Sequence, residues 1–156
     1  MEKYELLKDD TKIMLGRTLY RIKSVRDFGN VEKGDLGGYI ESENNLSHYG
    51  NAWVCDNARV CGNARVSDNA RVWGNAEVCG NAVIKSTEDY IVFKNNWSSG
   101  RHFTYTKSNK MWKVGCFYGT GQELIEKAYR DSELSGKCYE AYVKLVEQLE
   151  EIQEDK

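Results

Sequence analysis

Cationic and aromatic residues alternate between residues 101 and 120, which makes this stretch the part of the chain best suited to bind a ligand. The candidate residues are Arg101, His102, Tyr105, Lys107, Trp112, Lys113, Tyr118 and Thr120. Aromatic rings offer faces on which a base can stack, and Arg or Lys offers charge to a phosphate. Thr120 also opens a capping box, and the free amides of the helix that follows favour anions. We therefore expect a site for a small anionic, ring-bearing molecule, with a solvated hairpin face as the alternative.

Signatures of catalysis are missing from the sequence. The chain contains two histidines, His48 and His102, so few side chains could act as a general base. We find no Walker loop, no dinucleotide fingerprint, no HExxH motif and no ordered Ser-His-Asp set. We therefore expect a protein that is not an enzyme, with no catalytic residues and no cofactor.

Five cysteines are present, and none of them forms a CxxC pair. An odd number without that spacing argues against both a secreted disulfide framework and a zinc ribbon. Cys61 and Cys79 occupy equivalent positions of the repeat described next, where they could form a metal or redox pair. Because no His or third Cys accompanies them, we interpret them as two small packed side chains and expect no metal site.

One template, Asn-Ala-x-Val-x-Gly/Asp, recurs every six residues between residues 45 and 84. This period fits neither a helix nor a single strand, whereas three flat sides of six residues bring equivalent positions into register every eighteen. The inward positions should then stack about 4.8 Å apart. The predicted pairs are Val54 with Val72, Val60 with Val78, and Val66 with Ile84.

The elements on either side of the repeat complete the predicted fold. We expect a mainly β, α+β protein with three parts: an N-terminal β cap (1–44), a parallel β-helix (45–86) and a C-terminal ββαα module (87–156). In the third part, strand patterns with good turns precede a helix that begins after Thr120 and a second helix from about Lys137 to Glu154. We interpret Gly37 and Gly38 as backbone requirements at the start of the repeat rather than as a phosphate loop.

The six-residue repeat resembles the left-handed β-helix of hexapeptide-repeat proteins. The stretch from Leu19 to Val54, and the later motifs FT and VGCFYGT, are similar to a phage and prophage family of such proteins. The resemblance implies a short left-handed β-helix and a homo-oligomer, either a trimer or a multiple of three. In that family an Arg closes the FT strand, whereas this chain has Thr106 and Lys107 there, with Arg101 and His102 earlier.

Three functions are compatible with these features. We prefer a non-enzymatic phage-type oligomer that sequesters a small anionic ligand, and the resemblance implies that the ligand is a nucleotide immune signal of the host. The second is a hexapeptide acyltransferase that uses coenzyme A, with His48 or His102 as the base. The third is a purely structural trimeric assembly protein.

Charge and hydropathy narrow the range of partners. The net charge is −2, so no overall positive field favours binding of bulk nucleic acid. No stretch approaches the roughly 20 apolar residues of a membrane span, and no signal-peptide core is seen near the first residue. We therefore expect no membrane association and a cytoplasmic location in a bacterial host cell.

Overall fold

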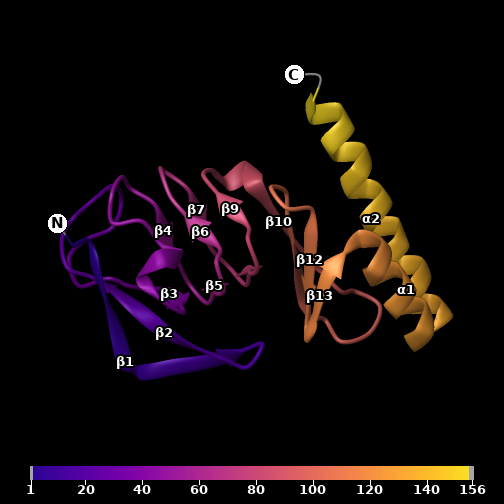
Figure 1. The fold of residues 1–156 in the computed structure, drawn as a ribbon, viewed down its shortest axis with the longest axis horizontal. Coiled ribbons are helices and arrows are strands. Elements are labelled where there is room, and N and C mark those ends of the chain that lie inside the picture. The colour runs from indigo at the N-terminus through magenta and orange to yellow at the C-terminus, as the bar shows by residue number, and fades with distance from the viewer. Residues whose placement is uncertain (1, 155–156) are drawn as a thin grey trace.

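Figure 1 shows a computed structural model of the chain, which describes residues 2–154. The N-terminal hairpin, the repeat, an antiparallel sheet and two helices follow one another along the long axis of the molecule. Strands β1 (Tyr4–Met14) and β2 (Arg17–Ser24) are antiparallel, and β3 (Leu36–Ile40) pairs antiparallel with β2. Strand β3 also pairs in parallel with β5 (Arg59–Val60), a strand of the repeat. The hairpin is therefore joined directly to the repeat.

The repeat forms six strands of two residues each, and strands three steps apart pair in parallel. The predicted eighteen-residue register is confirmed, because Val54 pairs with Val72, Val60 with Val78, and Val66 with Ile84. All six side chains are 0% exposed. The strands are β4 (Trp53–Val54), β5 (Arg59–Val60), β6 (Arg65–Val66), β7 (Arg71–Val72), β8 (Glu77–Val78) and β9 (Val83–Ile84).

The predicted fold class, a short left-handed parallel β-helix, is wrong. The fold is α+β, and the repeat strands are divided among separate small sheets. Strands β5 and β8 belong to a mixed five-stranded sheet of order β1-β2-β3-β5-β8, whereas β4-β7 and β6-β9 are two-stranded. The physical reason is that two-residue strands hold few hydrogen bonds, so the longer antiparallel strands around them dominate the sheet structure.

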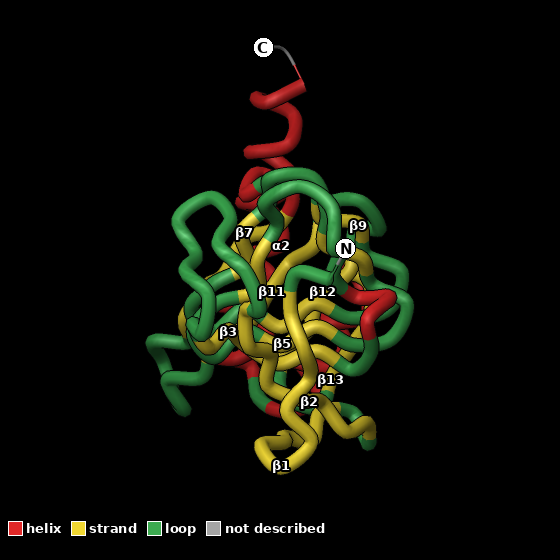
Figure 2. Tube along the Cα trace, turned by 90° about the vertical axis from the view of Figure 1, so that its left-hand side faces the viewer, coloured by secondary structure: helices red, strands yellow, loops and turns green. Residues whose placement is uncertain are grey.

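The C-terminal part is an antiparallel four-stranded sheet covered by two helices. Its strands, in the order β10-β11-β12-β13, are β10 (Tyr90–Lys94), β11 (His102–Thr106), β12 (Met111–Val114) and β13 (Phe117–Thr120). Helices α1 (Gly121–Asp131) and α2 (Glu133–Glu154) lie on the side of the sheet away from the repeat (Figure 1). Figure 2 shows that the end of α2 projects beyond the rest of the molecule. Within residues 2–154, no helix is long and apolar enough to cross a membrane.

The boundary between the two helices differs from the prediction. Helix α1 begins after Thr120 as predicted, with the Thr120 side chain accepting a hydrogen bond from the Glu123 amide. We expected Ser135 and Gly136 to end this helix, but it ends at Asp131, and α2 begins at Glu133 rather than at about Lys137. Gly136 lies inside α2, and a side chain there would collide with the ring of Tyr129. The glycine therefore permits close packing of the two helices instead of ending one of them.

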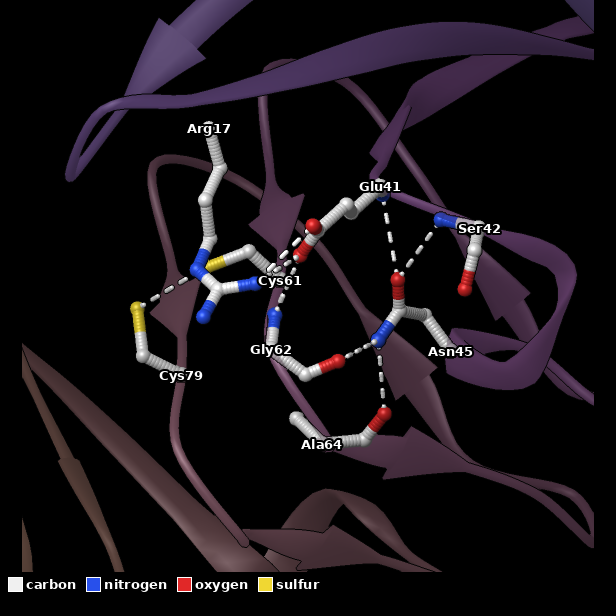
Figure 3. A network of polar contacts seen from close by, with 8 residues as sticks. All are labelled: Arg17, Glu41, Ser42, Asn45, Cys61, Gly62, Ala64 and Cys79. Carbon is white, nitrogen blue, oxygen red and sulfur yellow. Dashed lines mark hydrogen bonds and ion pairs between the residues drawn. The ribbon is translucent and has the colours of Figure 1, made fainter.

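Two similar 3-10 turns flank the repeat, η1 (Glu43–Asn45) before it and η2 (Thr87–Asp89) after it. In each turn a side-chain oxygen accepts the backbone amides three and four residues earlier: Asn45 from Glu41 and Ser42, and Asp89 from Lys85 and Ser86. The Asn45 amide group also donates to the carbonyls of Gly62 and Ala64, 17 and 19 residues later in the chain, at 3.1 and 2.8 Å (Figure 3). Asn45 is 0% exposed, so all of its hydrogen-bonding capacity is used inside the protein.

Lys3 anchors the start of β1 against the repeat. Its side chain is buried, its Nζ donates to the Ala52 carbonyl at 2.6 Å, and it lies 4.8 Å from the centre of the Phe28 ring. Burial, helped by the charge of Arg26, lowers the pKa of Lys3 from 10.5 to about 8. The folded protein therefore releases this proton more readily than the unfolded chain does.

The free energy of unfolding contributed by Lys3 should rise with pH between about 8 and 10. In this range the folded protein has lost the Lys3 proton while the unfolded chain still holds it, so stability increases, by about 2 kcal/mol. The raised pKa values of Tyr4 and Cys79 act in the opposite direction. Urea unfolding of wild type and Lys3→Met across this range isolates the Lys3 contribution. A difference between the two proteins that does not change with pH would contradict the prediction.

Candidate functional site

The four-stranded sheet divides the predicted ligand-binding residues between its two faces. Thr104 pairs with Lys113 and Tyr105 with Trp112, and neighbouring residues on a strand point to opposite sides. His102, Lys113 and Tyr118 face the repeat, whereas Tyr105 and Trp112 face the helices. The predicted site therefore does not exist as a single cluster.

The residues on the face toward the repeat mostly hold the two parts of the chain together. The Lys113 side chain is 4% exposed, and its Nζ lies 3.0 Å from the Glu77 carboxylate. The Tyr118 hydroxyl donates to the Cys79 carbonyl at 3.2 Å. These two side chains are therefore structural, and neither is available to bind a phosphate directly.

The residues on the opposite face lie in the core beneath the helices. Trp112 is 2% exposed and packs against Tyr105, with ring centres 4.9 Å apart. The Tyr105 hydroxyl donates to Glu150 of α2, and burial together with this carboxylate raises the pKa of Tyr105. Thr120 caps α1, and Lys107 lies apart at the end of β11, where its amide donates to the Asp89 carbonyl.

A first large cavity, of about 620 Å³, lies between the sheet and α2 and includes Tyr105, Trp112 and Thr120. Its rim carries four carboxylates and one ammonium group, from Glu147, Glu150, Glu151, Glu154 and Lys110. The ammonium of Lys110 is already paired with Glu150 at 2.8 Å. Because like charges repel, this acidic cavity does not suit the anionic ligand predicted from the sequence.

A second cavity of similar size, about 630 Å³, has the composition that an anion requires, and we call it the Arg101–Lys127 cavity. Two cations, Arg101 and Lys127, face a single carboxylate, Asp131. The remaining lining combines aromatic rings, neutral polar groups and small or apolar side chains: Phe117, Tyr118, Tyr139, Asn95, Ser98, Ser99, Ser135, Cys116, Val114, Leu124 and Ala128. The lining therefore provides charge, hydrogen-bond donors and flat apolar faces in one place.

Arg101 is positioned by the turn between β12 and β13. Gly115 has a φ of +56°, and the Arg101 guanidinium lies so close over it that a side chain at residue 115 would displace the guanidinium. Within residues 2–154, no hydrogen bond or ion pair engages this guanidinium. Arg101 also lines a smaller cavity of about 260 Å³ together with Arg59 and His102. It therefore lines both this cavity and the Arg101–Lys127 cavity.

Lys127 and Tyr139 complete the Arg101–Lys127 cavity from the two helices. The ammonium of Lys127 lies 2.8 Å from Asp131, and both side chains are well exposed, so this pair is largely screened by solvent. Burial raises the pKa of Tyr139, against the opposing charges of Arg101 and Lys127. The Tyr139 hydroxyl therefore remains protonated at neutral pH and can donate a hydrogen bond.

The sequence therefore identified part of this cavity and missed part of it. Arg101 and Tyr118 were predicted, and His102 lies in the adjoining smaller cavity. Lys127 and Tyr139 were missed because they come from helices, one on each, and only the packing of those helices brings them to Arg101. The turn sequence NNWSSG before Arg101, which supplies Asn95 and two serines, is the signal that could have extended the prediction.

His48 was the other candidate base, and it is engaged in contacts that hold the N-terminal strand. Its Nδ1 accepts the Lys3 amide at 3.0 Å, and its Nε2 lies 2.7 Å from Glu43. Its ring stacks on Tyr4 with centres 4.1 Å apart. Among residues 2–154, no group of three or more His, Cys, Asp or Glu side chains is arranged to hold a metal ion.

Comparison with models of known protein families and with curated proteins finds no match for this chain.

Proposed function

We propose that the protein binds a small anionic, ring-bearing molecule, such as a nucleotide, in the Arg101–Lys127 cavity, and that it does so without catalysing a reaction. The guanidinium of Arg101 is the observation that carries the proposal, because it lines two cavities and no group of residues 2–154 accepts a hydrogen bond from it. A planar guanidinium matches the geometry of phosphate and forms two hydrogen bonds with it at once.

The lining suggests how such a ligand would be oriented. A phosphate at Arg101 would also lie near Lys127, and the rings of Phe117 and Tyr139 offer faces for stacking a base. Ser99 supplies a hydroxyl group for a sugar, whereas Asn95 is 4% exposed and its amide group holds the turn through Trp97 and Ser98. The smaller cavity, on the other side of Arg101, is lined by Arg59, His102 and the Glu77 carboxylate, which lies 3.9 Å from Arg59.

The wider proposal combines this cavity with the family resemblance. We propose that the protein works in the cytoplasm of a bacterial host as a homo-oligomer and sequesters a nucleotide immune signal on behalf of a phage. Five free cysteines support a reducing compartment. Exposed Ile13, Leu36 and Trp73 provide apolar surface that subunits could cover. Light scattering coupled to gel filtration tests the oligomer, since a monomer at micromolar concentration would contradict it.

Thermal unfolding in the presence of a nucleotide panel tests the binding proposal directly. Cyclic nucleotides, cyclic dinucleotides and ADP-ribose derivatives should be included, with inorganic phosphate as a minimal probe. A ligand present at about 100 times its Kd adds about 2.7 kcal/mol, which corresponds to about 5 to 10 °C for a chain of this length. If no member of the panel raises the Tm, the proposal fails for nucleotides.

Arg101→Gln should raise the Kd of any nucleotide identified in this way by about 10- to 100-fold. The reason is that a hydrogen bond to a charged group contributes about 1.5 to 3 kcal/mol. Calorimetric titration measures the change. Arg65→Gln is the matched control, since Arg65 is an exposed residue of the repeat that does not line the cavity. The Arg65→Gln protein should bind the nucleotide like wild type. Equal affinities of the Arg101→Gln and Arg65→Gln proteins would place the ligand elsewhere.

A further inference from the structure

Cys61 and Cys79 lie side by side just after the paired strands β5 and β8. Val60 and Val78 are register partners in that parallel pair, so the cysteines that follow them are neighbours across it. Their sulfur atoms are 3.4 Å apart (Figure 3), and each residue is 1% exposed. The two packed side chains predicted from the sequence therefore bring their sulfur atoms within hydrogen-bonding distance.

The surroundings make the two thiols unequal. The Arg17 guanidinium pairs with Glu41 at 2.9 Å (Figure 3), and its positive charge acts on the Cys61 thiol. A hydrogen bond with Cys79 lowers the pKa of Cys61, against burial and the charge of Glu41, which raise it. The same hydrogen bond, together with burial, raises the pKa of Cys79. The positive charge of Arg17 acts on Cys61, so we assign the attack to Cys61 and the second step to Cys79.

We propose that Cys61 and Cys79 form an oxidation site, at which a peroxide converts the two thiols into an intramolecular disulfide. The Cys61 thiolate attacks one peroxide oxygen and breaks the O–O bond, giving a sulfenic acid and, after protonation, one water. The Cys79 sulfur then attacks the Cys61 sulfur, its proton leaves with the hydroxyl group as a second water, and the S–S bond forms. Two thiols are oxidised by two electrons, and hydrogen peroxide is reduced to two waters.

The backbone already has the spacing that this bond requires. A disulfide needs sulfur atoms about 2.05 Å apart and Cα atoms about 4.4 to 6.8 Å apart. Adjacent strands are about 4.8 Å apart, a spacing within this range of Cα separations. Each cysteine is 1% exposed, so hydrogen peroxide reaches the sulfur atoms through local opening of the surrounding side chains. The resulting bond would link β5 to β8 across an eighteen-residue segment.

Peptide mapping of the full-length protein tests the proposal. Reduced protein is treated with hydrogen peroxide, unfolded, alkylated and digested. We expect the peptides that contain Cys61 and Cys79 to be joined, with a mass two hydrogen atoms below the sum of the two reduced peptides. Dithiothreitol should separate them again. Because a closed loop restricts the unfolded chain, the Tm should rise by about 5 to 10 °C. The Cys116→Ser variant, which removes an exposed thiol, should behave in the same way.

The single variants separate the roles of the two thiols. Cys79→Ser should leave Cys61 as a sulfenic acid that dimedone labels, whereas Cys61→Ser should give no labelling at Cys79 and no rise in Tm. Alkylation of both Cys61 and Cys79 after peroxide treatment would overturn the proposal. A link formed only between two separate chains, or labelling of Cys116 alone, would overturn it as well.

Discussion

The Gly38→Ala protein should lose about 4 kcal/mol or more of its free energy of unfolding and should accumulate poorly in cells. A methyl group at Gly38 would lie 2.5 Å from the Ala58 carbonyl oxygen and 2.8 Å from Val54 Cγ1. The carbonyl cannot move away without cost, because it accepts the Tyr39 amide at 2.9 Å. The substitution therefore forces β3 away from β5 and breaks the junction between the hairpin and the repeat.

Gly74→Ala is the matched control for this prediction. Gly74 has a φ of +66°, but no atom lies within 4 Å of the added methyl group. This variant should therefore lose only about 1 to 2 kcal/mol of its free energy of unfolding, the cost of placing alanine in a left-handed backbone conformation. Chemical denaturation of both proteins compares the two costs. If Gly38→Ala costs no more than Gly74→Ala, the close approach of β3 to the repeat is not a packing constraint.

The Glu77→Gln protein should lose about 3 kcal/mol of stability. Glu77 is the carboxylate partner of the buried Lys113, which also donates to the Gly115 carbonyl, and an amide in its place leaves the ammonium without a counter-charge. Breaking one side of a buried pair costs about 3 to 5 kcal/mol, and the 21% exposure of Glu77 places it at the lower end of that range. Urea denaturation measures the loss.

Two further variants show whether the charge is responsible. The double variant Glu77→Leu with Lys113→Leu removes both charges and should recover most of the stability, since apolar pairs replace buried ion pairs at little cost. Glu147→Gln changes an exposed carboxylate and should alter stability by less than about 0.5 kcal/mol. A double variant as unstable as Glu77→Gln would show that packing, and not charge, sets the loss.

The sequence predicted the local geometry of the repeat more successfully than the fold class. A strict six-residue period allows only one arrangement in which every Val is buried, so the pairing of Val54 with Val72 could be derived. The period contains no information about the hydrogen bonds at the edges of the short strands. The antiparallel hairpin takes one edge, through β3 and β5, and makes the main sheet mixed.

The candidate site was harder to predict for a related reason. Residues close together in the sequence, such as Trp112 and Lys113, were grouped, although strand alternation sends them to opposite faces. Lys113 looked like a ligand-binding cation, but its burial beside Glu77 depends on how the sheet packs against the end of the repeat. Arg101 was predicted because it lies in a stretch where cationic and aromatic residues alternate, and that reasoning did not depend on its packing.

The two turns that flank the repeat have a consequence for how such chains change in length. Asn45 donates to carbonyls of the layer that follows it, whereas Asp89 keeps only the acceptor role of the equivalent turn. Each end is thus specified by its own turn, independently of the number of repeat strands between them. Duplication of one eighteen-residue unit in the gene would add one two-residue strand to each of the three sheets that hold repeat strands and would preserve both turns. Length variants of this protein should therefore differ by multiples of that unit.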